Sequence, residues 1–169
     1  MHPLARYIVD VPDFPQPGIL FRDITPLLRS QFTEAVAALD ALWSEADWNS
    51  IDAVAGIESR GFILAAALAE KRRKGFVPVR KKGKLPPPVV DRQYNLEYGS
   101  GVLEMQRGEG RLLLVDDVLA TGGTVAASAA LAVDAGFDVR HLGVLIDLGI
   151  AKDFRCLGQA PRCVIRYGS

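Results

Sequence analysis

The stretch of the sequence with the clearest chemical meaning is the ten-residue string VDDVLATGGT at residues 115–124. The apolar residues 112–115 are typical of a central parallel strand covered on both faces, so Asp116 and Asp117 come at the end of a buried strand. A loop of small residues follows, and an Ala-rich helix is expected from about Thr124. Backbone N–H groups and the dipole at a helix start favour an anion, and two glycines let the backbone approach it closely. We therefore expect the loop to bind a phosphate, while the carboxylates, which repel phosphate, face sugar hydroxyls or a hydrated metal ion. A phosphate beside a diol describes a phosphorylated ribose.

Other signatures of nucleotide binding and hydrolysis do not fit this sequence. It contains neither the GxxxxGK motif followed by Ser or Thr nor the dinucleotide motif GxGxxG. The string GIESRG at residues 56–61 places its serine one position away from the GxSxG spacing of a nucleophile elbow, which excludes a serine hydrolase. A plain strand–turn–helix with an aspartate cap is the simpler alternative for residues 115–124, but the full string favours a binding site.

The elements that must position these residues alternate between strands and helices. Apolar spacing and turn residues predict strands at residues 51–56, 76–79, 101–106, 112–115, 139–146 and 163–165. The same reasoning predicts helices at residues 32–46, 62–71 and 124–135. This order indicates one α/β domain over residues 1–169, with a mainly parallel twisted sheet flanked by helices.

Two segments lack regular spacing. The proline-rich residues 1–30 predict an irregular arm with one helical turn around residues 4–8. The proline triplet at residues 86–88 cannot lie inside a ladder of strands, so residues 83–95 are expected to form a loop or an extended flap.

Composition excludes several classes of protein. Twenty basic and twenty acidic residues give a net charge of zero, which argues against bulk electrostatic binding to nucleic acid or anionic membranes. No apolar run approaches the roughly 20 residues that span a bilayer, and residues 1–6 lack the apolar stretch of a secretory signal. Cys156 and Cys163 have no CxxC neighbour, so we expect no zinc site and reduced thiols in a cytoplasmic protein.

Residues 115–124 resemble the phosphoribosyl-diphosphate (PRPP) motif of the type I phosphoribosyltransferases. Within that family, four further segments resemble the adenine phosphoribosyltransferases: PDFPQPGILFRDI at residues 12–24, ESRGF at 58–62, RKKGKLP at 80–86 and LEYG at 96–99. They occur in the family's order and extend the resemblance from residue 12 to about residue 146. The resemblance implies the type I phosphoribosyltransferase fold, with the arm as a hood over the base pocket and a mobile flap that excludes water.

The resemblance also implies an activity. It predicts a glycosyltransferase of purine salvage that moves the 5-phosphoribosyl group of PRPP to N9 of adenine and yields AMP and pyrophosphate. It further implies a cytoplasmic homodimer that binds small molecules rather than nucleic acid or membrane. Mg²⁺ is expected as the cofactor, held mainly by PRPP and water near Asp116 and Asp117, with no direct protein ligand.

The same family pattern assigns a role to each matching residue. Asp116 and Asp117 are expected at the ribose hydroxyls, and the 5′-phosphate loop comprises Ala120, Thr121, Gly122, Gly123 and Thr124. The pyrophosphate is expected at Glu58, Ser59, Arg60, Arg80, Lys81, Lys84 and Tyr98, with Arg80 resembling a residue that reaches into a neighbouring subunit's site. Phe21 and Leu119 are expected on the two faces of adenine, with backbone groups of Leu20 and Arg22 reading its edge. Glu97 is expected to be the catalytic residue that handles the proton at N7.

Two alternatives remain open at this point. The first is a phosphoribosyltransferase for another nucleobase, either a 6-oxopurine or a pyrimidine. Oxopurine enzymes favour an acidic residue just after the PRPP loop, where this sequence has Ala126 and Ala127, so adenine is favoured. The second is a PRPP-binding regulator of the same fold, which would require an additional basic module that this chain lacks.

Overall fold

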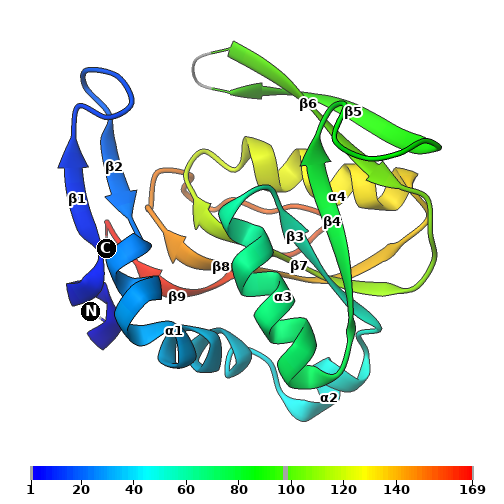
Figure 1. Ribbon diagram of the computed structural model, residues 1–169, viewed down its shortest axis with the longest axis horizontal. Helices are drawn as coiled ribbons and strands as arrows, with labels where there is room; N and C mark the ends of the chain where they lie inside the picture. Colours follow the sequence, from blue (N-terminus) through cyan, green and yellow to red (C-terminus); the bar gives the residue numbers. More distant parts are fainter. Residues whose placement is uncertain (1, 97–98, 169) are drawn as a thin grey trace.

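The central sheet has seven strands in the order β5-β6-β4-β3-β7-β8-β9 (Figure 1). The structure, a computed structural model, describes residues 2–96 and 99–168. The strands of this sheet are β3 (Ala53–Ile57), β4 (Gly75–Lys81), β5 (Val89–Leu96), β6 (Gly99–Gln106), β7 (Arg111–Leu119), β8 (Asp138–Asp147) and β9 (Arg162–Arg166). The helices are the 3-10 helix η1 (Pro3–Tyr7), α1 (Thr25–Asp40), α2 (Glu45–Asn49), α3 (Arg60–Arg72) and α4 (Gly123–Asp134).

The sheet is mainly parallel, which confirms the fold class expected from the sequence. Strand β3 runs parallel to both β4 and β7, and β7, β8 and β9 continue the parallel part. Strands β5 and β6 form an antiparallel hairpin, and β6 joins β4 through only two residue pairs, Arg80 with Glu104 and Lys81 with Leu103. The hairpin therefore extends beyond the body of the sheet.

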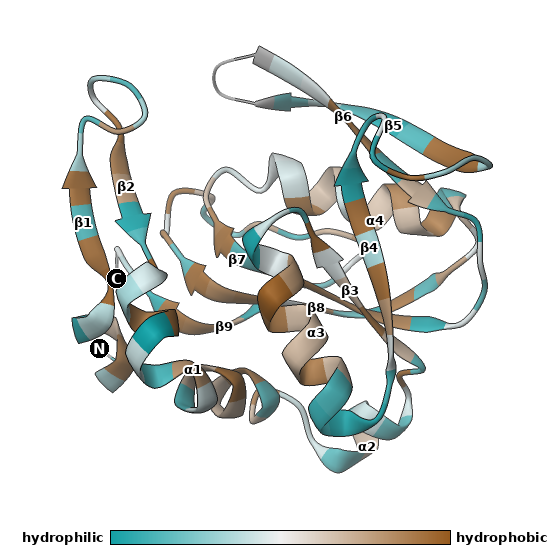
Figure 2. Cartoon of the chain, viewed as in Figure 1, coloured by the Kyte–Doolittle hydropathy of each residue, from teal (hydrophilic) through white to brown (hydrophobic). Residues whose placement is uncertain are grey.

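Helices cover both faces of the sheet, with α1 and α3 on one face and α4 on the other (Figure 1). Side chains alternate along β7, so Leu113 and Val115 pack in the cluster beneath α1 and α3, while Leu112 and Leu114 pack in the cluster beneath α4. Figure 2 shows apolar residues concentrated on these central strands. Burial on both faces explains why this strand is a continuous apolar run in the sequence.

The N-terminal arm is more regular than the sequence predicts. Strands β1 (Val9–Pro12) and β2 (Leu20–Asp23) form an antiparallel hairpin, which we call the hood. Helix α1 then begins at Thr25 rather than at residue 32. The Asp23 side chain accepts a hydrogen bond of 2.8 Å from the Thr25 N–H, and Pro26 is tolerated because first-turn N–H groups need no helical partner. The prediction of an irregular arm was therefore wrong, because a hairpin and the first turn of a helix both accept prolines.

The segment expected as a loop at residues 83–95 also differs. It is irregular only as far as the proline triplet, and β5 begins directly after it at Val89. Every residue of β5 has a partner on β6, and the prolines, which cannot donate to a ladder, all lie before the strand begins. The flap is therefore a β-hairpin preceded by a proline-rich turn.

None of the helices in the described part of the chain is long and apolar enough to cross a bilayer. Helix α3 ends in a basic run, and the left-handed conformation of Arg73, with φ 52°, terminates it.

Candidate active site

The site forms where two neighbouring parallel strands end and their chains leave the sheet in opposite directions. Strands β3 and β7 pair side by side, β3 leads into α3 on one face, and β7 leads into α4 on the other. This is a topological switch point, the place where open α/β sheets bind ligands beyond the carboxyl ends of their strands.

The acidic pair predicted from the sequence lies at this point. Asp116 and Asp117 are both buried, at 8% and 7% exposure, and Asp116 Oδ1 accepts a hydrogen bond of 2.9 Å from the Asp117 N–H. Gly61 of α3 packs so closely that a Cβ there would lie 2.9 Å from Asp116 Oδ1. Burial, and then the neighbouring charge of Asp117, raise the pKa of Asp116 well above its ordinary value. The surroundings of Asp116 therefore disfavour its charged form.

Arg60 connects the acidic pair to the hood. Its Nε lies 2.7 Å from Asp117 Oδ2, and its guanidinium lies 4.9 Å from the centroid of the Phe21 ring. The ion-pair distance is short, but Asp117 Oδ2 has no partner with hydrogen-bond geometry, so this buried oxygen keeps unused acceptor capacity. The structure thus brings together three residues that the sequence assigned to ribose, pyrophosphate and base.

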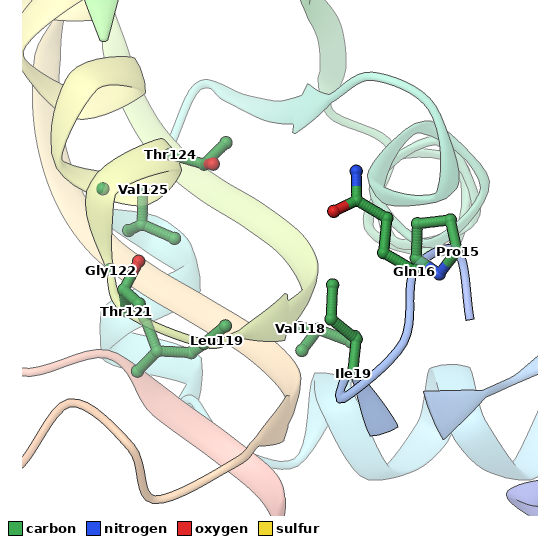
Figure 3. Close-up of a pocket in the computed structure, with 11 residues that line it drawn as sticks. Pro15, Gln16, Ile19, Val118, Leu119, Thr121, Gly122, Thr124 and Val125 are labelled. Carbon is green, nitrogen blue, oxygen red and sulfur yellow. The ribbon is translucent and has the colours of Figure 1, made fainter. Parts of the chain in front are cut away.

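The loop of small residues at 120–124 has the backbone shape of an anion site. Gly122 is the N-cap of α4 with φ 88°, and a Cβ at this position would meet the Phe154 ring at 2.3 Å. Among the described residues no side chain caps this helix, which leaves its first backbone N–H groups without a side-chain acceptor there. A cavity of about 380 Å³ lies between the loop and the hood, whose Pro15, Gln16 and Ile19 face the loop across it (Figure 3).

A second helix start, that of α3, lies on the other side of the acidic pair. Ser59 is exposed at its N-cap and makes no side-chain capping bond, which leaves backbone donors beside Arg60. The peptide bond between Glu58 and Ser59 is cis. The Glu58 carboxylate, expected from the sequence at the pyrophosphate, contacts the protein instead. Its Oε2 accepts a hydrogen bond of 2.9 Å from the Lys81 N–H and lies 3.3 Å from Arg80 Nε.

The predicted cations follow β4 at the same end of the sheet. Arg80 is half-buried against Glu58 and donates from Nη1 to the Lys84 carbonyl at 3.2 Å. Lys81 and Lys84 are exposed, and neither forms an ion pair with another described residue. Lys82 instead pairs with Asp91 at 3.1 Å. Two lysines thus remain available to an anionic ligand.

The hood contributes an aromatic ring and an open strand edge. Phe21 lies edge-on to Phe14 at 5.2 Å and lines a cavity of about 580 Å³ together with Val11, Phe14, Asp23, Thr25, Ser59 and Arg60. Because β1 and β2 form a sheet of two strands, β2 keeps one edge of backbone groups without a strand partner in the described chain. The Arg22 side chain turns elsewhere, pairing with Asp10 and lying 4.2 Å from the centroid of the Tyr167 ring.

The structure adds Val118 to the residues found from the sequence. Leu119, expected on one face of the base, is 2% exposed and packs in a small cluster with Val125 and Val144. Val118 is half-buried and lines the same cavity, where its side chain lies near Ile19 (Figure 3). Adjacent residues on a strand face opposite ways, and this alternation was the signal in the sequence that could have indicated Val118.

Glu97 and Tyr98, to which the sequence assigned proton handling and pyrophosphate contact, lie outside the described residues. Within residues 2–96 and 99–168, no three His, Cys, Asp or Glu side chains gather as a metal-binding cluster. The oxygen atoms of Asp116 and Asp117, one of them lacking a hydrogen-bond partner, are nevertheless the hard donors that suit a largely hydrated Mg²⁺.

Comparison with known families identifies the class of protein. A family model described as the phosphoribosyl transferase domain matches residues 28–152. The chain therefore belongs to the phosphoribosyltransferase family, as the sequence motifs predicted.

Individual relatives narrow the comparison to one branch of this family. Adenine phosphoribosyltransferase of Hydrogenovibrio crunogenus is 47% identical over 167 residues, covering 98% of this chain and 97% of the relative. Adenine phosphoribosyltransferase of Synechococcus sp. strain JA-3-3Ab is 54% identical over 160 residues, covering 91% and 90%. The crystal structure of adenine phosphoribosyltransferase from Rhodothermus marinus matches with a TM-score of 0.85 and 42% identity over 96% of each chain. The Saccharomyces cerevisiae enzyme, solved with adenine and an imino-altritol bisphosphate, matches with a TM-score of 0.86 at 32% identity, covering 95% and 96%.

The electrostatics of the acidic pair lead to a prediction on stability. An acid whose pKa is higher in the folded than in the unfolded protein loses stability as pH rises above the unfolded value, here 3.8. Asp116→Asn mimics the neutral form, so we expect it to raise Tm at pH 7 by about 2–4 °C, equivalent to roughly 1 kcal/mol. The gain should shrink as pH falls toward 4, where Asp116 is protonated in both states. Calorimetry at a series of pH values measures this difference.

Asp117→Asn is the matched control, because it removes the same charge from the neighbouring position but also breaks the ion pair with Arg60. We expect it to lower stability at pH 7 by about 1–2 kcal/mol, a modest cost because Arg60 is partly exposed. A fall in Tm for both variants at pH 7 would contradict the assignment of electrostatic strain to Asp116.

Proposed function

We propose that this chain transfers the 5-phosphoribosyl group of PRPP to N9 of adenine, forming AMP and releasing pyrophosphate. The observation that carries the proposal is the arrangement at the switch point, where two uncapped helix starts lie on either side of one acidic pair. A ligand with a phosphate at one end, a diol in the middle and a pyrophosphate on the other side matches the order of these groups. The adenine phosphoribosyltransferases at 47% and 54% identity support adenine as the acceptor.

The loop at residues 120–124 binds the 5′-phosphate in this proposal. The backbone N–H groups at the uncapped start of α4 and the hydroxyls of Thr121 and Thr124 supply donors, and the helix dipole adds favourable charge. Asp116 and Asp117 hold the ribose hydroxyls beside it. As the bond to pyrophosphate weakens, positive charge builds at the anomeric carbon, and fixed carboxylates next to it gain energy that they lack in the ground state. Asp116, whose anion is destabilised by burial, has most to gain from such a cation.

The start of α3 and the cations after β4 bind the leaving pyrophosphate. Backbone donors at Ser59, the guanidinium of Arg60 and the side chains of Lys81 and Lys84 provide charge-assisted hydrogen bonds to its oxygens. Arg80 and Tyr98 are assigned to the same subsite. When bound, Mg²⁺ neutralises part of the charge on the leaving group, and Asp116 and Asp117 would hold it through its water shell.

Adenine enters between the hood and β7. We assign its two faces to Phe21 and to the end of β7 at Val118 and Leu119, and its edge to the open backbone of β2 at Leu20 and Arg22. Glu97 handles the proton at N7 while N9 acts as the nucleophile. The hairpin of β5 and β6, with the turn before it, closes over the site and keeps water from the ribosyl cation. Such an enzyme serves purine salvage, and we place it in the cytoplasm.

We also propose that the chain forms a homodimer through the face of α3 and β4. Ile63 and Phe76 are 45% and 40% exposed there, and Phe76 stacks edge-on with Phe62 at 5.7 Å. Exposed apolar groups at this position suit a partner surface of the same kind. Sedimentation equilibrium should give twice the chain mass, and a monomer at micromolar concentration would contradict the dimer.

The activity is tested by mixing the protein with adenine, PRPP and Mg²⁺ and separating nucleotides by chromatography. We expect AMP and pyrophosphate to form in equal amounts, and little product with hypoxanthine, guanine or orotate. Efficient use of one of these other bases would replace adenine as the substrate, and PRPP binding without any product would favour a regulator of the same fold.

Arg80→Ala is expected to raise KM for PRPP by about 10-fold or more, because a charge-assisted contact contributes roughly 1.5–3 kcal/mol. Lys82→Ala is the matched control, since Lys82 is adjacent but pairs with Asp91 on the surface, and it should leave KM for PRPP within twofold. Steady-state kinetics at saturating adenine distinguishes the two. Equal KM values for wild type and Arg80→Ala would remove Arg80 from the pyrophosphate subsite.

A further inference from the structure

The cationic segment at residues 80–85 rests on a buried carboxylate that no part of the function described so far requires. Glu104 lies on β6, directly opposite Arg80 in the register of the two strands, and is only 3% exposed. It is one of the few charged groups in the described structure that are buried to this extent. Burying a charge costs free energy unless the group is hydrogen-bonded or paired. The contacts of Glu104 therefore indicate which part of the structure it stabilises.

Within the described part of the chain, the hydrogen bonds of the Glu104 carboxylate all go to one turn. Oε1 accepts from the backbone N–H of Lys84 at 2.7 Å and of Leu85 at 2.6 Å, and Oε2 accepts from that of Gly83 at 3.0 Å. Three successive N–H groups that converge on one anion form a nest, a backbone shape that binds anions. These bonds outweigh burial and lower the pKa of Glu104, so the group is ionised at neutral pH.

Little else holds this turn in place. Gly83 has φ 83° and no atom within 4 Å of the place a Cβ would occupy, and Lys84 is exposed. Beyond Glu104, the described hydrogen bond of residues 83–85 is that of Arg80 Nη1 to the Lys84 carbonyl. The flanking residues are held by the Lys82 N–H to the Val102 carbonyl at 2.9 Å, by the surface pair of Lys82 with Asp91, and by Gln106 Nε2, which donates to the Pro86 carbonyl at 3.2 Å. The location of the Lys84 backbone therefore depends on Glu104, and with it one of the two polar contacts that hold the Arg80 guanidinium, the other being Glu58.

We propose that Glu104 is a positioning residue for PRPP. It fixes the turn at residues 83–85 so that Lys84 and Arg80 are held in the geometry that receives the pyrophosphate group. This inference rests on the proposed function, and it assigns Glu104 no contact with the ligand. A cation held in place before binding loses less conformational entropy on binding than one on a mobile turn. We therefore expect Glu104 to raise the affinity for PRPP and to leave the affinity for adenine unchanged.

Glu104→Gln is the test substitution, because it keeps the size of the side chain but replaces one acceptor oxygen by an NH₂ group that cannot accept. We expect KM for PRPP to rise about tenfold, with KM for adenine within twofold and kcat within about threefold. Titration calorimetry with PRPP and Mg²⁺ should show the same loss of affinity in the absence of adenine. Asp91→Asn is the control, since Asp91 faces Glu104 across the β5–β6 pair but is exposed, and it should leave both constants unchanged.

A double-mutant cycle separates positioning from general support of the fold. If Glu104 acts through Lys84, then Glu104→Gln in a Lys84→Ala background should raise KM for PRPP by much less than tenfold, about threefold or less. The same cycle is run with Arg80→Ala, because Arg80 bonds the Lys84 carbonyl, which Lys84→Ala retains. Full tenfold effects of Glu104→Gln in both the Lys84→Ala and the Arg80→Ala backgrounds would show that Glu104 acts through neither cation and would overturn the proposal. If Glu104→Gln does not fold, the cycle is run with Glu104→Asp, which keeps the charge but shortens its reach.

The outcomes also separate this inference from the proposed function. A wild-type protein that forms no AMP contradicts the function itself. A wild type that forms AMP, together with a folded Glu104→Gln variant whose KM for PRPP is unchanged, leaves the function standing and overturns the positioning role.

Discussion

The contact between Arg60 and Asp117 is the interaction on which the site depends. Arg60 opens α3 and Asp117 lies near the carboxyl end of β7, so their 2.7 Å ion pair joins the two halves of the switch point. The same guanidinium lies on Phe21 and so connects the sheet to the hood. Without such a cation, two buried carboxylates would stand side by side beneath a site that receives several phosphate groups on the proposed function. The positive charge of Arg60 allows acidic and anion-binding groups to share one small region.

This arrangement is costly for the fold, and the rest of the structure offsets the cost. Asp116 is strained as an anion, Asp117 keeps an oxygen without a hydrogen-bond partner, and glycine is required at Gly61 and Gly122 for steric reasons. Natural proteins accept such features at functional sites when a well-packed core surrounds them. Here the cores on both faces of β7 supply that support, since its residues 112–115 are almost completely buried.

The structure at the centre of the sheet could be predicted from the sequence, whereas that of the N-terminal arm and the β5–β6 hairpin could not. The apolar run into Asp116 and Asp117 specified a central strand, and the glycines after it specified a loop that opens a helix, because each feature has few structural alternatives. The hood hairpin and the early start of α1 were missed, since prolines there suggested irregular backbone although a hairpin and a first helical turn both accept them. The role of Glu104 could not be read from sequence at all, because its three partners lie about twenty residues away and are backbone groups. Val118 was missed for a simpler reason: alternation along the strand places it on the face opposite Leu119, and the strand predicted from the sequence did not extend that far.

The open edge of β2 bears on how this protein could change over evolutionary time. On the proposed assignment, the acceptor base is selected by main-chain donors and acceptors, whose pattern is the same whatever side chains the strand carries. Random substitution at Leu20 or Arg22 would then alter packing or solubility while leaving substrate choice largely intact. A shift toward a different base would demand a new path of the polypeptide itself, which point mutations rarely deliver. On this assignment, the choice of base tolerates side-chain mutations in the hood because a sheet of only two strands leaves the backbone edge of β2 open.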